Sequence, residues 1–144
     1  MAHATGVIGL AHYATSVDVS GHKIVADEPP NNGGEDAGPT PYDLLLASLA
    51  ACTAITLRMY ADRKQWNLKS LTVELSFIRG ADKSEHVNRR LQLDGDLNEE
   101  QRARIADIAE RTPVTLTLKR GIPIITTLVS IPASPDGIAN PAEP

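Results

Sequence analysis

Apolar and polar residues alternate in two neighbouring segments, and this period of two predicts two β-strands. In residues 68–80 the alternating apolar positions are Leu71, Val73, Leu75 and Phe77. In residues 86–97 they are Val87, Leu91 and Leu93. Arg89 and Arg90, which lie between them, are expected to face water or a partner. The short loop GADKSE joins the two strands into a predicted hairpin.

Strand signals also occur towards both ends of the chain. Residues 5–28 are rich in β-branched residues and contain the turn signal Ser20-Gly21, which predicts another hairpin. Residues 29–39, PPNNGGEDAGP, hold many glycines and prolines and predict a loop. Residues 122–130, IPIITTLVS, predict a last strand.

The most apolar segment, residues 44–57, predicts a buried helix because apolar residues occupy nearly every side of it. Thr40 is a good N-cap, Pro41 suits the first helical position, and Asp43 completes a capping-box pattern. A small domain can hardly cover such a helix with its own strands. We therefore expect a second copy of the chain to cover it in a homodimer.

A second helix is predicted to begin at Asn98, with Gln101 at its third position, and to run to Thr112. Its apolar stripe is narrow, so one face is expected to be wet. A short helical turn is expected after Pro113. The resulting order, β-β-α-β-β-α-β, predicts an α+β fold with an antiparallel sheet wrapped on helices.

Length and charge narrow the possible classes of protein. The 144 residues suit one domain over 1–131, with a proline- and alanine-rich tail at 132–144 that is expected to be disordered. The net charge of −4 and the lack of a long basic run argue against nucleic acid and against anionic membranes as partners. The apolar run at 44–57 is shorter than a membrane span, and no signal peptide is recognisable. We expect a cytoplasmic protein.

Cys52 is the single cysteine, so an internal disulfide is excluded. A free cysteine is often a small buried hydrophobe, but the small residues around this one, SLAACTA, leave space for a substrate or a partner backbone. A reactive thiol needs a cation or donor that lowers its pKa from about 8.5. On one helix, Arg58 lies about 9 Å along the axis from Cys52 and Asp43 about 13.5 Å away. Either would have to act from a partner helix or through a relay.

The segment from Gly38 to Lys64, GPTPYDLLLASLAACTAITLRMYADRK, closely resembles the active-site helix of the OsmC/Ohr family. These are the osmotically inducible and organic-hydroperoxide-resistance proteins. The resemblance continues before the helix in HKIVADEPPNNGGEDAG and after it in RLQLDGDLNEEQRARIADIAERTPV and IPIITTL. It covers most of the chain apart from the extreme termini.

This resemblance implies an intertwined α+β homodimer, with antiparallel sheets wrapped around two central helices and active sites at the subunit interface. Catalytic members of the family are thiol-dependent peroxidases that reduce organic hydroperoxides. Cys52 matches the peroxidatic cysteine, whose thiolate attacks the peroxide to give a sulfenic acid. In the family, a second cysteine in a late CPV motif condenses with this sulfenic acid. An N-terminal arginine and a glutamate at the helix start poise the thiolate.

The chain departs from the family pattern at three places. The CPV motif reads Thr112-Pro113-Val114, so a threonine that cannot form a disulfide replaces the second cysteine. The carboxylate at the helix start is Asp43, one place later than the family glutamate, whose position holds Tyr42. Residues 1–57 contain no arginine, so the activating cation is missing from its usual segment unless Arg58, Lys23 or a residue from another strand replaces it.

Two functions from different classes fit these residues. The first is a one-cysteine peroxidase that acts on an organic hydroperoxide, uses an external thiol as reductant and needs no cofactor. The second is a non-catalytic module that binds a small hydrophobic or thiol-bearing ligand at the dimer interface. The candidate catalytic residues are Cys52, Asp43 and Arg58, and the candidate binding residues are Tyr42, Thr112 and Pro113. No metal is expected, because the four histidines are scattered.

Overall fold

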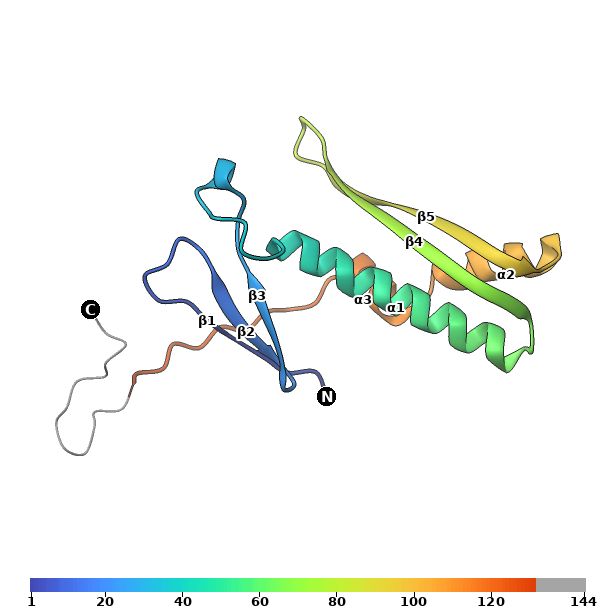
Figure 1. Cartoon of the computed structure of the whole chain (residues 1–144), viewed down its shortest axis with the longest axis horizontal. Helices are drawn as coiled ribbons and strands as arrows, with labels where there is room; N and C mark the ends of the chain where they lie inside the picture. The colour runs from blue at the N-terminus through green and yellow to red at the C-terminus, as the bar shows by residue number, and fades with distance from the viewer. Residues whose placement is uncertain (132–144) are drawn as a thin grey trace. The chain divides into compact units, whose positions relative to one another are not determined.

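The computed structural model describes residues 1–131 of the chain (Figure 1). These residues form two compact units, one made of residues 39–122 and the other of residues 1–38 with the segment that begins at Pro123. The single domain expected over 1–131 stays a prediction. The expected disordered tail, 132–144, lies outside the described residues.

The N-terminal unit is a three-stranded antiparallel sheet in the order β1-β2-β3, made of Ala4–Val7, Thr15–Val19 and His22–Ala26. The turn predicted at Ser20-Gly21 is confirmed, because Val19 pairs with His22 and both turn residues have positive φ angles of 51° and 90°. One strand more is present than the sequence predicted. Residues 8–14 leave the sheet as a loop and divide the expected first strand into β1 and β2.

The breaker-rich loop that follows β3 is organised around Asp27, whose side chain is buried. Its carboxylate accepts hydrogen bonds from four backbone N–H groups, those of Tyr13, Glu28, Glu35 and Ala37. A short 3-10 turn, Pro30–Asn32, follows. Gly34 passes so close to the Glu28 carbonyl that an added Cβ would lie 1.9 Å from its oxygen, and only glycine fits there.

The C-terminal unit is built on α1, Pro41–Arg63. Its predicted start is confirmed as a capping box, in which the Asp43 N–H donates to Thr40 Oγ1 at 3.1 Å and the Thr40 N–H donates to Asp43 Oδ2 at 2.9 Å. The hydrogen bond from the Thr40 backbone N–H, and after it one from the Thr40 side chain, lowers the pKa of the Asp43 carboxyl. By length and composition alone α1 could cross a membrane, a test that the core helices of globular proteins also pass. The prediction that the chain has no membrane span rested on the apolar run of residues 44–57, and α1 is longer than this run.

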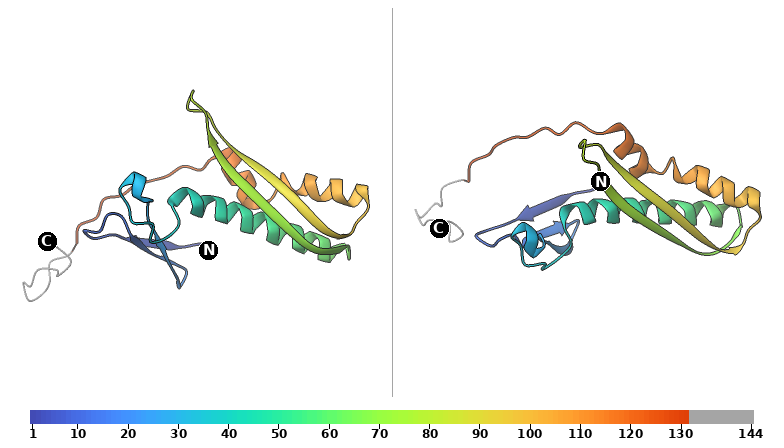
Figure 2. Two further views of the ribbon diagram at one scale, coloured as in Figure 1. Left: turned by 45° about the horizontal axis from the view of Figure 1, so that its top comes forward. Right: turned by 90° about the horizontal axis from the view of Figure 1, so that it is seen from above.

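The predicted hairpin is confirmed as β4, Asn67–Arg79, paired antiparallel with β5, Glu85–Asp96. The helix α1 contacts β4, α2 (Glu99–Ala109) and α3 (Pro113–Arg120), as Figures 1 and 2 show. The buried core of this unit lies between them and consists of Leu57, Ala61, Leu68, Leu97, Ile105 and Ala109. The hairpin and the other two helices therefore bury one face of α1 in common.

The structure differs from the sequence prediction in three elements. The helix α2 ends at Ala109 instead of Thr112, because Thr112 precedes a proline and takes the extended conformation that such residues favour. The turn expected after Pro113 is a full eight-residue helix, α3. Residues 121–131 form no strand, because they find no sheet edge to pair with in the described part of one chain. The observed order of strands and α-helices is β-β-β-α-β-β-α-α.

Candidate active site

Cys52 lies on α1 beside the buried stripe formed by Leu49, Thr53, Leu57 and Ala61. Its side chain is half-buried, and its sulfur has polar neighbours. The backbone N–H of Val114 donates a hydrogen bond to Cys52 Sγ at 3.4 Å, and Thr56 Oγ1 lies 4.0 Å from the same sulfur. The thiol is therefore partly accessible and faces a hydrogen-bond donor, which a purely aliphatic packing site would not provide.

The donor to the sulfur belongs to the first turn of α3. Thr112 is the N-cap, and Pro113 occupies the first helical position, where its missing N–H leaves no bond unmade. Val114 therefore carries the first free N–H of the helix, at the end where the peptide dipoles sum to a partial positive charge. A negatively charged sulfur is stabilised by such a donor.

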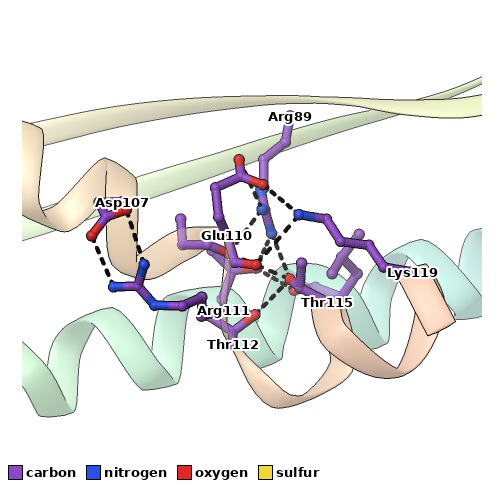
Figure 3. A network of polar contacts seen from close by, with 10 residues as sticks. Arg89, Asp107, Glu110, Arg111, Thr112, Thr115 and Lys119 are labelled. Atoms are coloured by element: carbon purple, nitrogen blue, oxygen red, sulfur yellow. Dashed lines mark hydrogen bonds and ion pairs between the residues drawn. The ribbon is translucent and has the colours of Figure 1, made fainter.

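A part-buried arginine from the hairpin, Arg89, joins α1 to α3, and Figure 3 shows its guanidinium beside Thr115 and Glu110. Arg89 Nη1 donates to Thr53 Oγ1 at 3.1 Å and to Thr115 Oγ1 at 2.9 Å, and Nη2 donates to the Ala109 carbonyl at 2.8 Å. The side chain is only 12% exposed. The expectation that Arg89 faces water or a partner was therefore wrong, whereas Arg90 is 85% exposed as expected.

The threonine in place of the second cysteine belongs to the same network. The Oγ1 atoms of Thr112 and Thr115 lie 2.6 Å apart, and both side chains are buried. On the outer side, Glu110 lies 2.7 Å from Lys119 Nζ and 3.7 Å from Arg89 Nη2. The hydrogen bond from Lys119 is the main cause that lowers the pKa of Glu110. Thr112 thus contributes its hydroxyl to a polar network.

The other predicted site residues have different neighbours. Asp43 caps α1, and Arg58 donates to Asp62 at 2.9 Å and to the Leu68 carbonyl. Among the described residues, neither makes a hydrogen bond to Cys52. Tyr42 stacks on Phe77, and its hydroxyl receives a hydrogen bond from Arg79 at 3.3 Å. Their assignment to the site stays a prediction, whereas Thr112 and Pro113 do lie at the start of the helix that reaches the sulfur.

Two features of the site were missed from the sequence. Arg89 follows the same alternation as Val87, Leu91 and Leu93, so its position in the strand already indicated the buried face. The positive charge of Arg89 suggested an exposed side chain, against the two-residue alternation of the strand. A guanidinium can nevertheless lie on an inner face where oxygen acceptors surround it. The Val114 donor is a backbone group that becomes recognisable only once α3 is placed against α1.

Next to the network lies a cavity of about 660 Å³ between β5 and the three helices. Its walls include the apolar side chains of Leu49, Val87, Leu91 and Leu118. Polar groups of Glu85, His86, Arg89, Glu110 and Lys119 also line it. Within residues 1–131, no three histidine, cysteine, aspartate or glutamate side chains are grouped so as to hold a metal ion.

Solved structures share this fold. An OsmC-like protein from Mycoplasma pneumoniae is 20% identical with a TM-score of 0.71, over 83% of this chain and 87% of that one. An organic hydroperoxide resistance protein OsmC from Legionella pneumophila is 22% identical with a TM-score of 0.61, over 83% and 89%. The organic hydroperoxide resistance protein OhrB of Bacillus subtilis is 21% identical with a TM-score of 0.55, over 81% and 90%.

No curated protein sequence matches this chain. The sequence model that describes OsmC-like proteins matches residues 33–127, which include α1 with Cys52, the hairpin, α2 and α3. This match spans more than half of the chain and agrees with the fold of the solved structures. The chain belongs to the family of OsmC-like proteins.

Proposed function

We propose that this protein is a thiol-dependent peroxidase that reduces organic hydroperoxides through Cys52 alone. The observation that carries the proposal is the half-buried Cys52 sulfur held 3.4 Å from the free backbone N–H of Val114. This donor takes the place of a cation close to the thiol. The names of the hydroperoxide resistance proteins from Legionella and Bacillus, which share the fold, support this reaction class.

The reaction that we propose has two stages. The Cys52 thiolate attacks the distal oxygen of the hydroperoxide, the O–O bond breaks, and the alkoxide takes a proton and leaves as an alcohol. The cysteine becomes a sulfenic acid. An external thiol then displaces water to form a mixed disulfide, and a second external thiol releases Cys52 as a thiol. The sum is one hydroperoxide and two thiols converted to one alcohol, one water and one disulfide.

The external reductant follows from Thr112. This residue occupies the position of the second cysteine in the family motif, and its hydroxyl bonds Thr115. A hydroxyl cannot condense with a sulfenic acid to form a disulfide. The reductant is therefore a small dithiol or monothiol that enters through the accessible side of Cys52.

We further propose that the working unit is a homodimer. The face of α1 away from its buried stripe carries exposed apolar side chains, with Ile55 55% and Met59 59% exposed, and Leu45, one turn before Leu49, is 38% exposed. Residues 122–131 expose a second set of aliphatic side chains, namely those of Ile122, Ile124, Ile125, Leu128, Val129 and Ile131. A second copy would cover the helix face and offer a strand partner to this segment.

The peroxidase is tested with stoichiometric cumene hydroperoxide. We expect Cys52 to gain one oxygen, trapped as a dimedone adduct and located by mass spectrometry, with C52S as the control. Turnover is then followed with dihydrolipoamide, and two thiols are expected to disappear per hydroperoxide. If wild-type Cys52 stays reduced while a two-cysteine family member reacts, the proposal is wrong.

The cavity of about 660 Å³ favours one other function, a module that binds a small apolar ligand without turnover. Its walls combine aliphatic side chains with a few polar groups, as small-molecule sites do. The same mixing experiment separates the two functions. A binding module would retain an unoxidised Cys52 while an apolar fluorescent probe is displaced from the cavity by the hydroperoxide.

A further inference from the structure

Arg89 Nη1 contacts two threonines. Each of them is the sequence neighbour of a residue in the hydrogen bond between the Val114 N–H and Cys52 Sγ. Thr53 follows Cys52 on α1, and Thr115 follows Val114 on α3. Arg89 Nη1 lies 3.1 Å from the first hydroxyl and 2.9 Å from the second. One guanidinium nitrogen therefore bridges α1 and α3 one residue away from each member of the pair.

We infer that Arg89 is the positioning residue of the Cys52 thiol, holding the start of α3 against α1 so that the Val114 N–H points at the sulfur. This inference rests on the proposed function and adds to it the residue that keeps the thiol reactive. Arg89 would act through Val114, because its own hydrogen bonds go to Thr53, Thr115 and Ala109. It is not a catalytic residue.

The directions of the hydrogen bonds favour this role. Thr53 donates its own hydroxyl to the Leu49 carbonyl at 2.7 Å, so towards Arg89 it can only accept. Thr115 donates its hydroxyl to the Ala109 carbonyl at 3.5 Å and lies 2.6 Å from Thr112 Oγ1, so it accepts the hydrogen bond from Arg89. A lysine offers a single point of charge in place of a planar fork, so it cannot reach both hydroxyls and the Ala109 carbonyl in this geometry.

Arg89 forms one long ion pair, with the carboxylate of Glu110. This carboxylate lies 3.7 Å away and is bound more closely by Lys119, at 2.7 Å. The other titratable groups that line the adjoining cavity are Glu85 and His86 of β5. Because the three hydrogen bonds of Arg89 go to neutral oxygens, the guanidinium serves as a geometric clamp that joins β5, α1, α2 and α3.

The experiment measures how fast iodoacetamide alkylates Cys52 between about pH 5 and pH 9, where thiolates form. T115V removes the hydroxyl at nearly unchanged size, and T115S keeps it. R89M removes the guanidinium, and R89K replaces it with an ammonium group. R90M is the control, because Arg90 is the neighbouring exposed residue. Circular dichroism and thermal unfolding confirm that each variant is folded.

We expect the midpoint of the alkylation curve to rise by about one pH unit in T115V and R89M, as the loss of a hydrogen bond to a charged group predicts. R89K should fall between R89M and the wild type, and T115S and R90M should match the wild type. A merely structural Arg89 would lower the melting temperature without moving the midpoint, and that result would overturn the inference.

Oxidation by cumene hydroperoxide, measured on the same variants, separates this inference from the proposed function. If wild-type Cys52 is not oxidised, the peroxidase proposal fails whatever the variants do. If the wild type is oxidised and T115V reacts as fast as T115S, only the role of Arg89 is refuted. Should R89M fail to fold, the comparison of T115V with T115S still decides, because both keep the arginine.

Discussion

The backbone N–H of Val114 lies 3.4 Å from Cys52 Sγ, although the two residues are 62 positions apart in the chain. This contact joins the middle of α1 to the first turn of α3. The family pattern has an N-terminal arginine beside the thiol, whereas residues 1–57 of this chain contain none. A helix start provides a fixed donor in its place, which needs no counter-ion and carries no flexible side chain.

The first prediction concerns this donor. V114P removes the N–H without loss of an intrahelical bond, and it also makes Pro113 the residue before a proline, which disfavours the helical conformation at Pro113, so the start of α3 has to be checked in this variant. V114A removes the side chain and keeps the N–H. We expect alkylation of Cys52 at pH 7 to slow about tenfold in V114P, since hydrogen bonds to charged groups contribute about 1.5 to 3 kcal/mol.

Comparison of V114P with V114A separates the loss of the N–H from the loss of the side chain. Iodoacetamide rates are compared under identical conditions, with far-ultraviolet circular dichroism to confirm that the helices persist. V114A should alkylate at the wild-type rate. Equal rates in V114P and V114A would show that the sulfur gains nothing from this N–H, and the role assigned to α3 would have to be abandoned.

A second prediction restores the missing cysteine. Thr112 precedes the turn of α3 that touches Cys52, at the position where the family motif carries its second cysteine. We expect T112C to form a disulfide between Cys52 and the introduced thiol after one equivalent of hydroperoxide, whereas the wild type stops at the sulfenic acid. Thiol titration before and after the addition should show two thiols lost in the variant.

T112S is the control, because it keeps a hydroxyl that can still bond Thr115. It should behave as the wild type does and lose one thiol. If T112C also loses one thiol only, the start of α3 does not lie where the second sulfur of the family acts, and an external reductant would no longer follow from Thr112 alone.

The parts of the fold that depend on local chemistry could be predicted from the sequence. The caps at Thr40 and Asn98 are short-range patterns, and both capping boxes are present. The strand alternation around Leu71 and Leu91 is equally local, and β4 and β5 followed from it. Such elements are specified within a few residues, so no knowledge of distant neighbours is required.

The parts that depend on distant neighbours were not predictable in the same way. The strand alternation placed Arg89 on the inner face, but no local pattern states that threonines of α1 and α3 meet its guanidinium there. Residues 122–130 have the composition of a strand, but a strand forms only where a sheet edge is available to pair with it. The sequence indicated that this segment favours the strand conformation, but it did not indicate which strand would pair with it.

A third prediction separates the cap of α1 from the thiol chemistry. Thr40 and Asp43 satisfy each other's backbone N–H groups, so T40A and D43A should each lower the free energy of unfolding by about 1 kcal/mol. Neither change should alter the alkylation rate of Cys52, because neither residue contacts its sulfur. A selective loss of alkylation in D43A would instead assign Asp43 the catalytic role expected from the family pattern.

A fourth prediction concerns the pH dependence of stability. Four backbone N–H groups, of which that of Ala37 has the largest effect, hold the pKa of the Asp27 carboxyl below its ordinary value. A lowered pKa in the folded state means that the unfolded chain binds more protons in acid. The stabilisation by Asp27 is therefore present above the unfolded-state pKa of about 3.9 and is lost as the pH falls through the folded-state value.

Urea unfolding at neutral pH and in mild acid tests this effect. D27N should be less stable than the wild type at pH 7, and the difference should shrink as the pH falls. D36N, an exposed carboxylate in the same loop, is the matched control and should follow the wild-type curve. A constant gap between D27N and the wild type at every pH would mean that the charge of Asp27 contributes nothing.

The fifth prediction tests the proposed homodimer through the two faces of α1. Leu49 is 5% exposed within one chain, so L49K places a charge in the core and should prevent folding altogether. Ile55 is 55% exposed, so a charge there is harmless to a single chain and harmful only to a second copy that covers it. Light scattering at micromolar concentration should report twice the chain mass for the wild type.

The I55E variant should report one chain mass and keep its helical circular dichroism, because its glutamate meets water once the partner has left. This outcome is specific, since a variant that merely unfolded would lose both signals together, as L49K should. A wild-type protein that scatters as a monomer would refute the homodimer. The exposed apolar side chains of α1, such as Ile55 and Met59, would then need another partner.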